Sequence, residues 1–156
     1  MITDREYLFK FNNIIREGDK IYRNAAKNAG LSDCAFWIIY TLREKGNLLT
    51  QSEICDLIYL PKQTVNSALK KLEGEGCIEL KNGSDRRCKQ VSLTGKGVLL
   101  AEKTVDQVIA QEEKTFARLS PDEKDTFLRL NRKYIDLLKA NLQPLEGPPE
   151  QDAPLL

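Results

Sequence analysis

Two short stretches of the chain concentrate hydrogen-bonding groups and positive charge. The first combines amides, hydroxyls and ammonium groups at Lys62, Gln63, Thr64, Asn66, Ser67 and Lys70. The second contains Asp85, Arg86, Arg87 and Lys89. Amides and hydroxyls can hydrogen-bond base edges in a major groove, and Lys and Arg bind phosphates. These residues together predict contact with a double-stranded nucleic acid, and an ordinary solvated helix face is the alternative for the first stretch.

The positive charge is local. Residues 60–97 contain eight Lys and Arg against four Asp and Glu, whereas the whole chain of 156 residues has a net charge of +1. A nearly neutral protein does not coat nucleic acid indiscriminately. A basic surface, if present, must therefore be confined to this segment.

The histidine and cysteine content of the chain argues against metal binding and hydrolytic chemistry. The chain has no histidine, and its four cysteines lie too far apart for paired zinc ligands. The absence of histidine removes the commonest general base and the usual partner of a Ser or Cys nucleophile. We therefore expect no metal, no cofactor and no enzymatic activity, and a small enzyme is a remote alternative.

The cysteines divide into two kinds. Cys34, Cys55 and Cys77 stand among apolar or small residues and are interpreted as core. Cys88 lies inside the basic cluster, where neighbouring cations would favour its reactive thiolate if it were exposed. Redox sensing through Cys88 is therefore an open alternative.

Helical spacing places the first stretch of polar residues within a series of helices. Apolar residues at three- and four-residue intervals predict a long helix over about 4–27, stopped by Gly30. Ser32 is a suitable N-cap for a second helix, which Gly46 ends. One compact domain is expected from a chain of this length.

A third and a fourth helix follow. Thr50 and Glu53 form a capping box, and the helix that they start is predicted to turn Ile54, Cys55, Leu57 and Ile58 inward. Pro61 fits the first turn of the fourth helix, which runs to about residue 73 and stops at Gly74 or Gly76. In that helix the core positions are Val65, Ala68, Leu69 and Leu72. A period of 3.6 then exposes Gln63, Asn66, Ser67 and Lys70 on the opposite face.

A hairpin and two further helices complete the pattern. Strands over about 78–81 and 89–93 alternate around Asn82 and Gly83, so the basic cluster would lie at the hairpin tip. One long helix is predicted from Val98 to Leu119. A second capping box, Ser120 to Glu123, then opens a last helix.

The hairpin carries a specific resemblance. Residues 85–94 match the wing signature D-x-R-x(5)-L-T of MarR-type regulators, and Gly95 and Gly97 follow as they often do there. The order of elements over about 5–142 is also similar to that family. The resemblance implies that Arg87 reaches a minor groove and that Asp85 helps to hold it. A weak surface ion pair is the alternative for these two residues.

The resemblance implies a fold that is mainly α with a small β-hairpin wing, an α+β winged helix-turn-helix. Within a domain over 1–143, about 31–97 would form the DNA-binding lobe, and about 5–28 and 98–142 would be dimerisation helices. Residues 144–156 are rich in proline and acids and are expected to be disordered. A homodimer is implied, and intramolecular packing of the three long helices is the alternative.

The expected function is a sequence-specific, double-stranded DNA-binding transcriptional regulator, a homodimeric repressor acting on a pseudo-palindromic operator. In the family, small aromatic or phenolic anions often bind between the dimerisation helices and the lobe, but nothing in the sequence identifies such a pocket. No signal peptide and no run of about 20 apolar residues is present, which predicts a cytoplasmic protein without membrane contact. A winged-helix module that binds protein instead of DNA is the alternative.

Overall fold

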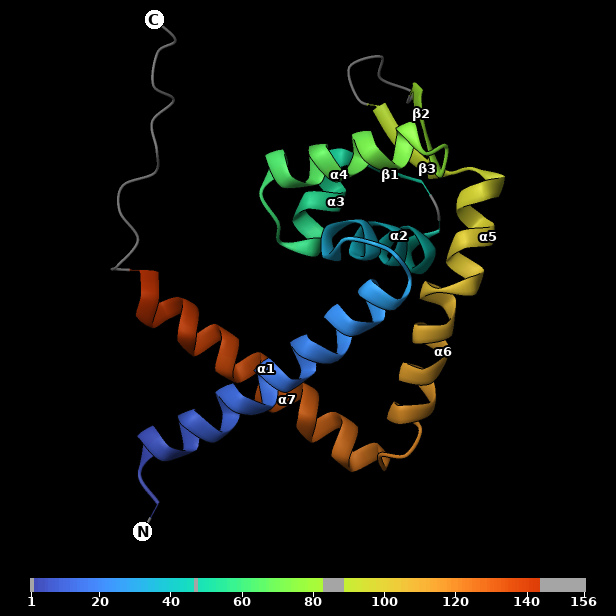
Figure 1. The fold of residues 1–156 in the computed structure, drawn as a ribbon. Helices are drawn as coiled ribbons and strands as arrows, with labels where there is room; N and C mark the ends of the chain where they lie inside the picture. Colours follow the sequence, from blue (N-terminus) through green and yellow to red (C-terminus); the bar gives the residue numbers. More distant parts are fainter. Residues whose placement is uncertain (1, 47, 83–88, 144–156) are drawn as a thin grey trace, which may run out of the picture. The chain divides into compact units, whose positions relative to one another are not determined.

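The fold is mainly helical with one small sheet, as expected (Figure 1). The computed structural model describes residues 2–46, 48–82 and 89–143. Its elements are α1 (Asp4–Asn28), α2 (Asp33–Lys45), β1 (Leu49–Thr50), α3 (Gln51–Ile58), α4 (Lys62–Gly74), β2 (Ile78–Asn82), β3 (Lys89–Leu93), α5 (Gly95–Lys103), α6 (Val105–Phe116) and α7 (Pro121–Leu142). They form two compact units, Met1–Gln111 and Glu112–Leu156.

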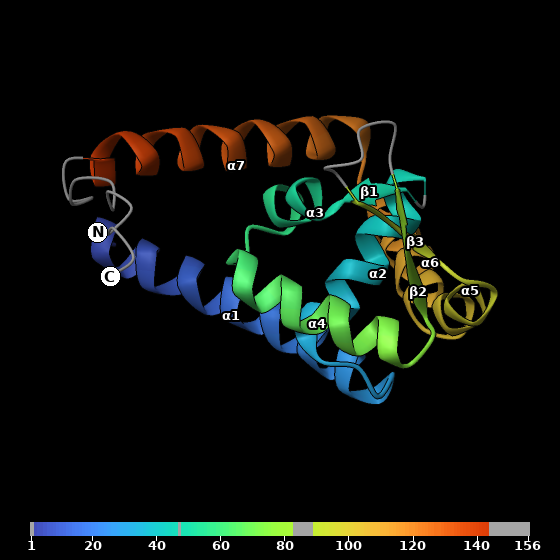
Figure 2. The ribbon, with the colours of Figure 1, turned by 90° about the horizontal axis from the view of Figure 1, so that it is seen from above.

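Helix α2 is the centre of the first unit. It contacts α1, α3, α4, α5 and β3. Figure 2 shows α3 and α4 on one side of α2 and α5 on the other. The side chains of Phe36, Ile38, Ile39 and Leu42 are fully buried, and they meet Ile54 and Leu72 within one apolar core. The apolar face of α4 packs into this core through residues such as Leu72, and this packing fixes the position of the polar face on the other side of the helix.

The sheet has three antiparallel strands in the order β1-β3-β2. Strands β2 and β3 form the predicted hairpin, with Ile78 opposite Leu93 and Asn82 opposite Lys89. The additional strand β1 pairs Leu49 with Val91 and was not predicted. Its two residues are too few to show the alternation by which a strand is recognised in a sequence.

The predicted helix starts are confirmed at Ser32, Thr50 and Ser120. The Thr50 and Ser120 capping boxes are both complete, and Thr3 forms a third one at the start of α1. The placement of Pro61 was wrong by one position. With φ −57° and ψ 139°, Pro61 is the N-cap of α4 and stands before its first turn. Its extended ψ is incompatible with a helical residue.

The predicted helix over 98–119 is broken into α5 and α6. Thr104, between them, has φ −130° and ψ −83°, and its hydroxyl donates to the carbonyl of Leu100 (2.7 Å). Such bonds from a threonine to the carbonyl four residues back favour bending. Val105, directly after the break, is fully buried. The Arg43 guanidinium also holds the Asp106 carboxylate through two bonds, of 2.8 and 2.5 Å.

The second unit centres on α7. Phe116 and Phe127 meet edge to face, with ring centroids 6.1 Å apart. No residue of α7 is buried within the single chain. Its exposed apolar residues are Phe127, Leu128, Leu130, Ile135, Leu137, Leu138 and Leu142. No helix among the described residues is long and apolar enough to span a membrane.

Candidate nucleic-acid interface

Helices α3 and α4 and the turn between them form the candidate recognition unit. Val65, Leu69 and Leu72 are buried, as predicted, and Ala68 packs against the core. The opposite face of α4 exposes Lys62, Gln63, Thr64, Ser67 and Lys70, whereas Asn66, which was predicted to be exposed, is half-buried. The structure thus brings all six predicted residues of this stretch onto one helix.

Two of these residues also make contacts within the fold. The Ser67 hydroxyl donates to the carbonyl of Gln63 (3.0 Å), which leaves its oxygen free to accept. The Cys34 thiol donates a hydrogen bond to the backbone carbonyl of Thr64, with sulfur and oxygen 3.8 Å apart. The first turn of α4 contains no acidic residue. A phosphate approaching this end would therefore meet Lys62 and the positive end of the helix dipole.

The hairpin β2-β3 supplies the base of the wing. Lys89 is exposed at the start of β3, opposite the last residue of β2. On β2, Lys81 pairs with Glu79 (2.7 Å), and this bond is the main cause that lowers the pKa of the Glu79 carboxyl. The predicted contacts Asp85, Arg86 and Arg87, and Cys88 with its redox hypothesis, lie outside the described residues.

The end of the wing signature has a structural role. The Thr94 hydroxyl donates to the carbonyl of Gly76 (2.7 Å) and accepts from the backbone N–H of Gly97 (3.1 Å). A Cβ at Gly97 would lie 1.9 Å from the carbonyl oxygen of Cys77. Only glycine therefore allows α5 to approach the chain between α4 and β2 so closely. These contacts fix the wing relative to the recognition helix.

Tyr59, between α3 and α4, was missed at the sequence level. It is the only non-glycine residue with positive φ (54°) among the residues described, and its side chain is 89% exposed. It directly follows α3 and lies three residues before Lys62. No sequence signal pointed to it, because tyrosine is not a residue typical of left-handed turns.

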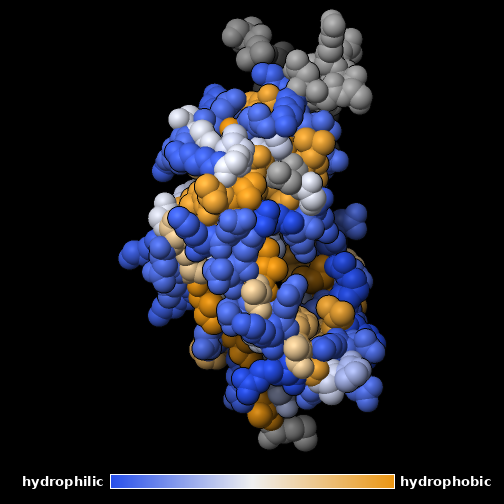
Figure 3. Space-filling view, turned by 90° about the vertical axis from the view of Figure 1, so that its right-hand side faces the viewer, coloured by the Kyte–Doolittle hydropathy of each residue, from blue (hydrophilic) through white to orange (hydrophobic). Residues whose placement is uncertain are grey.

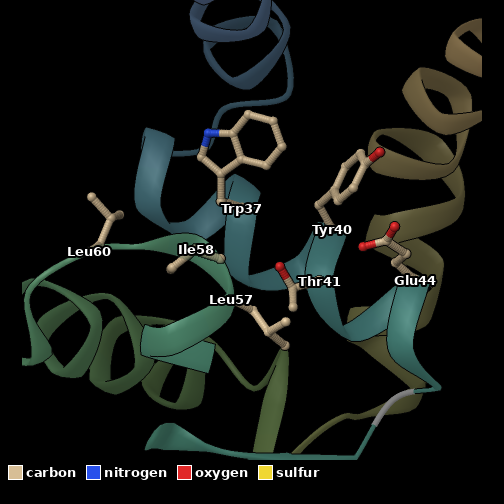
Figure 4. Close-up of a pocket in the computed structure, with 7 residues that line it drawn as sticks. All are labelled: Trp37, Tyr40, Thr41, Glu44, Leu57, Ile58 and Leu60. Atoms are coloured by element: carbon tan, nitrogen blue, oxygen red, sulfur yellow. The ribbon is translucent and has the colours of Figure 1, made fainter. Parts of the chain in front are cut away.

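A pocket adjoins the recognition unit. It has a volume of about 350 Å³ and is lined by Trp37, Tyr40, Thr41, Glu44, Leu57, Ile58 and Leu60 (Figure 4). The first four follow one face of α2 at positions i, i+3, i+4 and i+7. The prediction that Leu57 points inward was wrong, because it is 41% exposed and forms part of this wall. The spacing of Trp37, Tyr40, Thr41 and Glu44 on one face of α2 was the sequence signal that could have indicated this wall of the pocket.

The described cysteines are structural. Cys34 and Cys77 are buried and Cys55 packs against the core. Burial raises the pKa of the Cys34 thiol, and the neighbouring Cys55 adds to this effect. A thiol with a raised pKa is a poor nucleophile at neutral pH.

Comparison with known proteins agrees with this geometry. Residues 29–87 match the model of the MarR family. The chain is 26% identical over 133 residues to YwoH of Bacillus subtilis, an uncharacterised HTH-type transcriptional regulator, covering 85% of this chain and 96% of YwoH. It resembles the structure of NMB1585, a MarR family regulator from Neisseria meningitidis, with 25% identity and a TM-score of 0.77 over 90% of this chain and 99% of that one.

A third likeness is to the S. aureus MepR–DNA complex, with a TM-score of 0.68, 21% identity and coverage of 85% and 96% of the two chains. The fold and the interface thus define a winged helix-turn-helix protein. The match over residues 29–87, together with these likenesses, makes the chain similar to regulators of the MarR family.

Proposed function

We propose that this regulator binds a pseudo-palindromic DNA site as a homodimer and represses transcription until an effector binds. The observation that carries the proposal is α4, which is anchored in the core on one face and offers amides, hydroxyls and ammonium groups on the other. Two such helices, related by two-fold symmetry, would enter successive major grooves about 34–36 Å apart.

The side chains divide by chemistry. Gln63 and Asn66 carry amides that can make paired hydrogen bonds with a base edge, and so they would read sequence. Lys62, Lys70 and Lys89 are cations suited to phosphates, which give affinity without sequence preference. Thr64 and Ser67 supply hydroxyls for either target. Arg86 would join the phosphate contacts, and Arg87, held by Asp85, would enter the minor groove beside them.

The dimer is supported by apolar surface on the terminal helices. On α1 the exposed large apolar residues are Tyr7, Leu8, Phe9, Ile14, Ile15 and Ile21. On α7 no residue is buried. Exposed apolar side chains in this number, on helices that include no candidate membrane span among the described residues, favour a protein partner, and a second copy of the chain is the simplest one. Apolar patches (orange) between charged ones (blue) also reach the surface on the side of α5 and α6 (Figure 3).

Selection of bound fragments from the source genome tests the proposal. A DNA-binding regulator should enrich a small set of fragments that share a near-palindrome with half-sites about 10 base pairs apart. Recovery without any shared sequence, together with no retention of DNA at low salt, would instead favour a module that binds protein.

A further inference from the structure

The pocket beside the recognition unit has an aromatic wall with a carboxylate. Trp37 and Tyr40 pack edge to face, with ring centroids 5.2 Å apart, and the tilted ring of Tyr22 lies 5.1 Å from that of Trp37. Figure 4 shows the Glu44 carboxylate on the same side of α2 as the Tyr40 ring. Leu57, Ile58 and Leu60 form the apolar wall across from them.

The described residues that line the pocket carry one negative charge and no positive charge. Glu44 is the only charged residue among the seven described lining residues, and none of them is Lys or Arg. The adjacent Arg43 is held by Asp106 through its Nε (2.8 Å) and does not line the pocket. An anionic ligand would therefore lose water without gaining a cationic partner, which is unfavourable. A cation would gain the Glu44 carboxylate and contact with the aromatic side chains of Trp37 and Tyr40, which also line the pocket.

We propose that this pocket binds a hydrophobic organic cation, such as an aromatic quaternary ammonium. The inference rests on the proposed function, because it assigns the chemical class of the effector. It departs from the aromatic anions that the resemblance to the MarR family implies. The volume of about 350 Å³ fits one aromatic ring with a small cationic group.

The position of the pocket explains how such a ligand reaches the DNA-binding surface. Its walls come from α2, the central helix, and from α3 and the turn that leads into α4. A ligand between these walls would directly contact α2, α3 and the turn that position the recognition helix α4. If the pocket differs between the DNA-bound and free forms, ligand and DNA must change one another's affinity by the same factor.

Trp37 makes the proposal directly measurable, because it is the only tryptophan of the chain and it lines the pocket. We would titrate the full-length protein with benzyltrimethylammonium, benzyl alcohol and phenylacetate, and follow Trp37 fluorescence at low salt. The cation should give a saturable change at a concentration at least about tenfold lower than the neutral compound or the anion.

Variants of Glu44 test the charge. Because Glu44 is exposed and its replacement leaves the core intact, Glu44→Gln should weaken the cation by about fivefold to tenfold. Glu44→Lys should abolish cation binding and let phenylacetate bind more tightly than the cation. Glu73→Gln removes an exposed acid of α4 that does not line the pocket, and it should leave every titration unchanged.

Tighter binding of phenylacetate than of the cation by the parent protein would overturn the proposal. So would the absence of a saturable Trp37 signal, or equal cation affinity in the parent and Glu44→Gln. DNA binding by fluorescence anisotropy without any ligand is measured in parallel. Intact DNA binding with a failed cation titration refutes only the ligand class, whereas failed DNA binding refutes the proposed function itself.

Discussion

Tyr59 holds a left-handed backbone conformation in the turn before the recognition helix. This conformation costs a residue with a Cβ roughly 1–2 kcal/mol, and glycine avoids the cost while losing about 0.5–1 kcal/mol through its greater freedom when unfolded. We expect Tyr59→Gly to stabilise the fold by about 0.5–1 kcal/mol and to raise the melting temperature by about 1–4 °C. Tyr59→Ala, which keeps the strain, is the control. Equal melting temperatures for the two variants would show that the backbone at Tyr59 is not strained.

Gly97 provides a second prediction at a single residue. Because a Cβ would lie 1.9 Å from the backbone oxygen of Cys77, Gly97→Ala must push α5 away from the end of α4. We expect a loss of about 3 kcal/mol in the free energy of unfolding, measured by urea denaturation. Gly95 has no neighbour within 4 Å of its built Cβ, so Gly95→Ala should change stability by less than about 1 kcal/mol. Similar losses in both variants would contradict the close approach.

At the scale of the element, the capping box of α3 links stability to pH. The Glu53 carboxylate accepts from the backbone N–H of Thr50 (2.7 Å) and from its hydroxyl (2.8 Å), and these bonds lower its pKa below 4.5. A lowered pKa in the folded state stabilises the protein above the unfolded value and loses this effect as the pH falls through the folded value.

Glu53→Ala should therefore lower the melting temperature at pH 7, and the difference from the parent should shrink as the pH falls below about 4.5. Glu53→Gln keeps an acceptor without the titrating group, so its difference from Glu53→Ala should vary less over the same range. Thermal melts followed by circular dichroism check this. A difference between parent and Glu53→Ala that stays constant from pH 7 to pH 3 would contradict the assignment.

The elements also show what a sequence can reveal. The caps at Thr50 and Ser120 and the buried face of α4 were predictable, because each depends on residues within two turns of one another. The break at Thr104 and the strand β1 depend on contacts with distant segments, so local patterns did not show them. The pocket was missed because its walls come from two helices and a turn, and the local pattern on α2 indicates only one of these walls.

At the scale of the whole molecule, the exposed apolar surface predicts the oligomeric state. Leu128 and Leu137 are exposed on α7, a helix in which no residue is buried in the single chain. The parent protein should be a dimer in light scattering at micromolar concentration, and Leu128→Asp with Leu137→Asp should shift it toward the monomer. Truncation before Ser120 should leave an aggregating or poorly folded chain. A monomeric, soluble parent protein would contradict the dimer.

The central claim is that α4 reads DNA sequence while the cations around it bind phosphates. The direct measurement is a fluorescence-anisotropy salt titration of the parent protein and of single alanine variants on operator and scrambled duplexes. Gln63→Ala and Asn66→Ala should each cost about 1–3 kcal/mol on the operator and leave nonspecific binding almost unchanged. Lys70→Ala should weaken binding to both duplexes and reduce the salt slope by about one unit. If all three variants bind both duplexes as the parent does at every salt concentration, α4 is not the recognition helix.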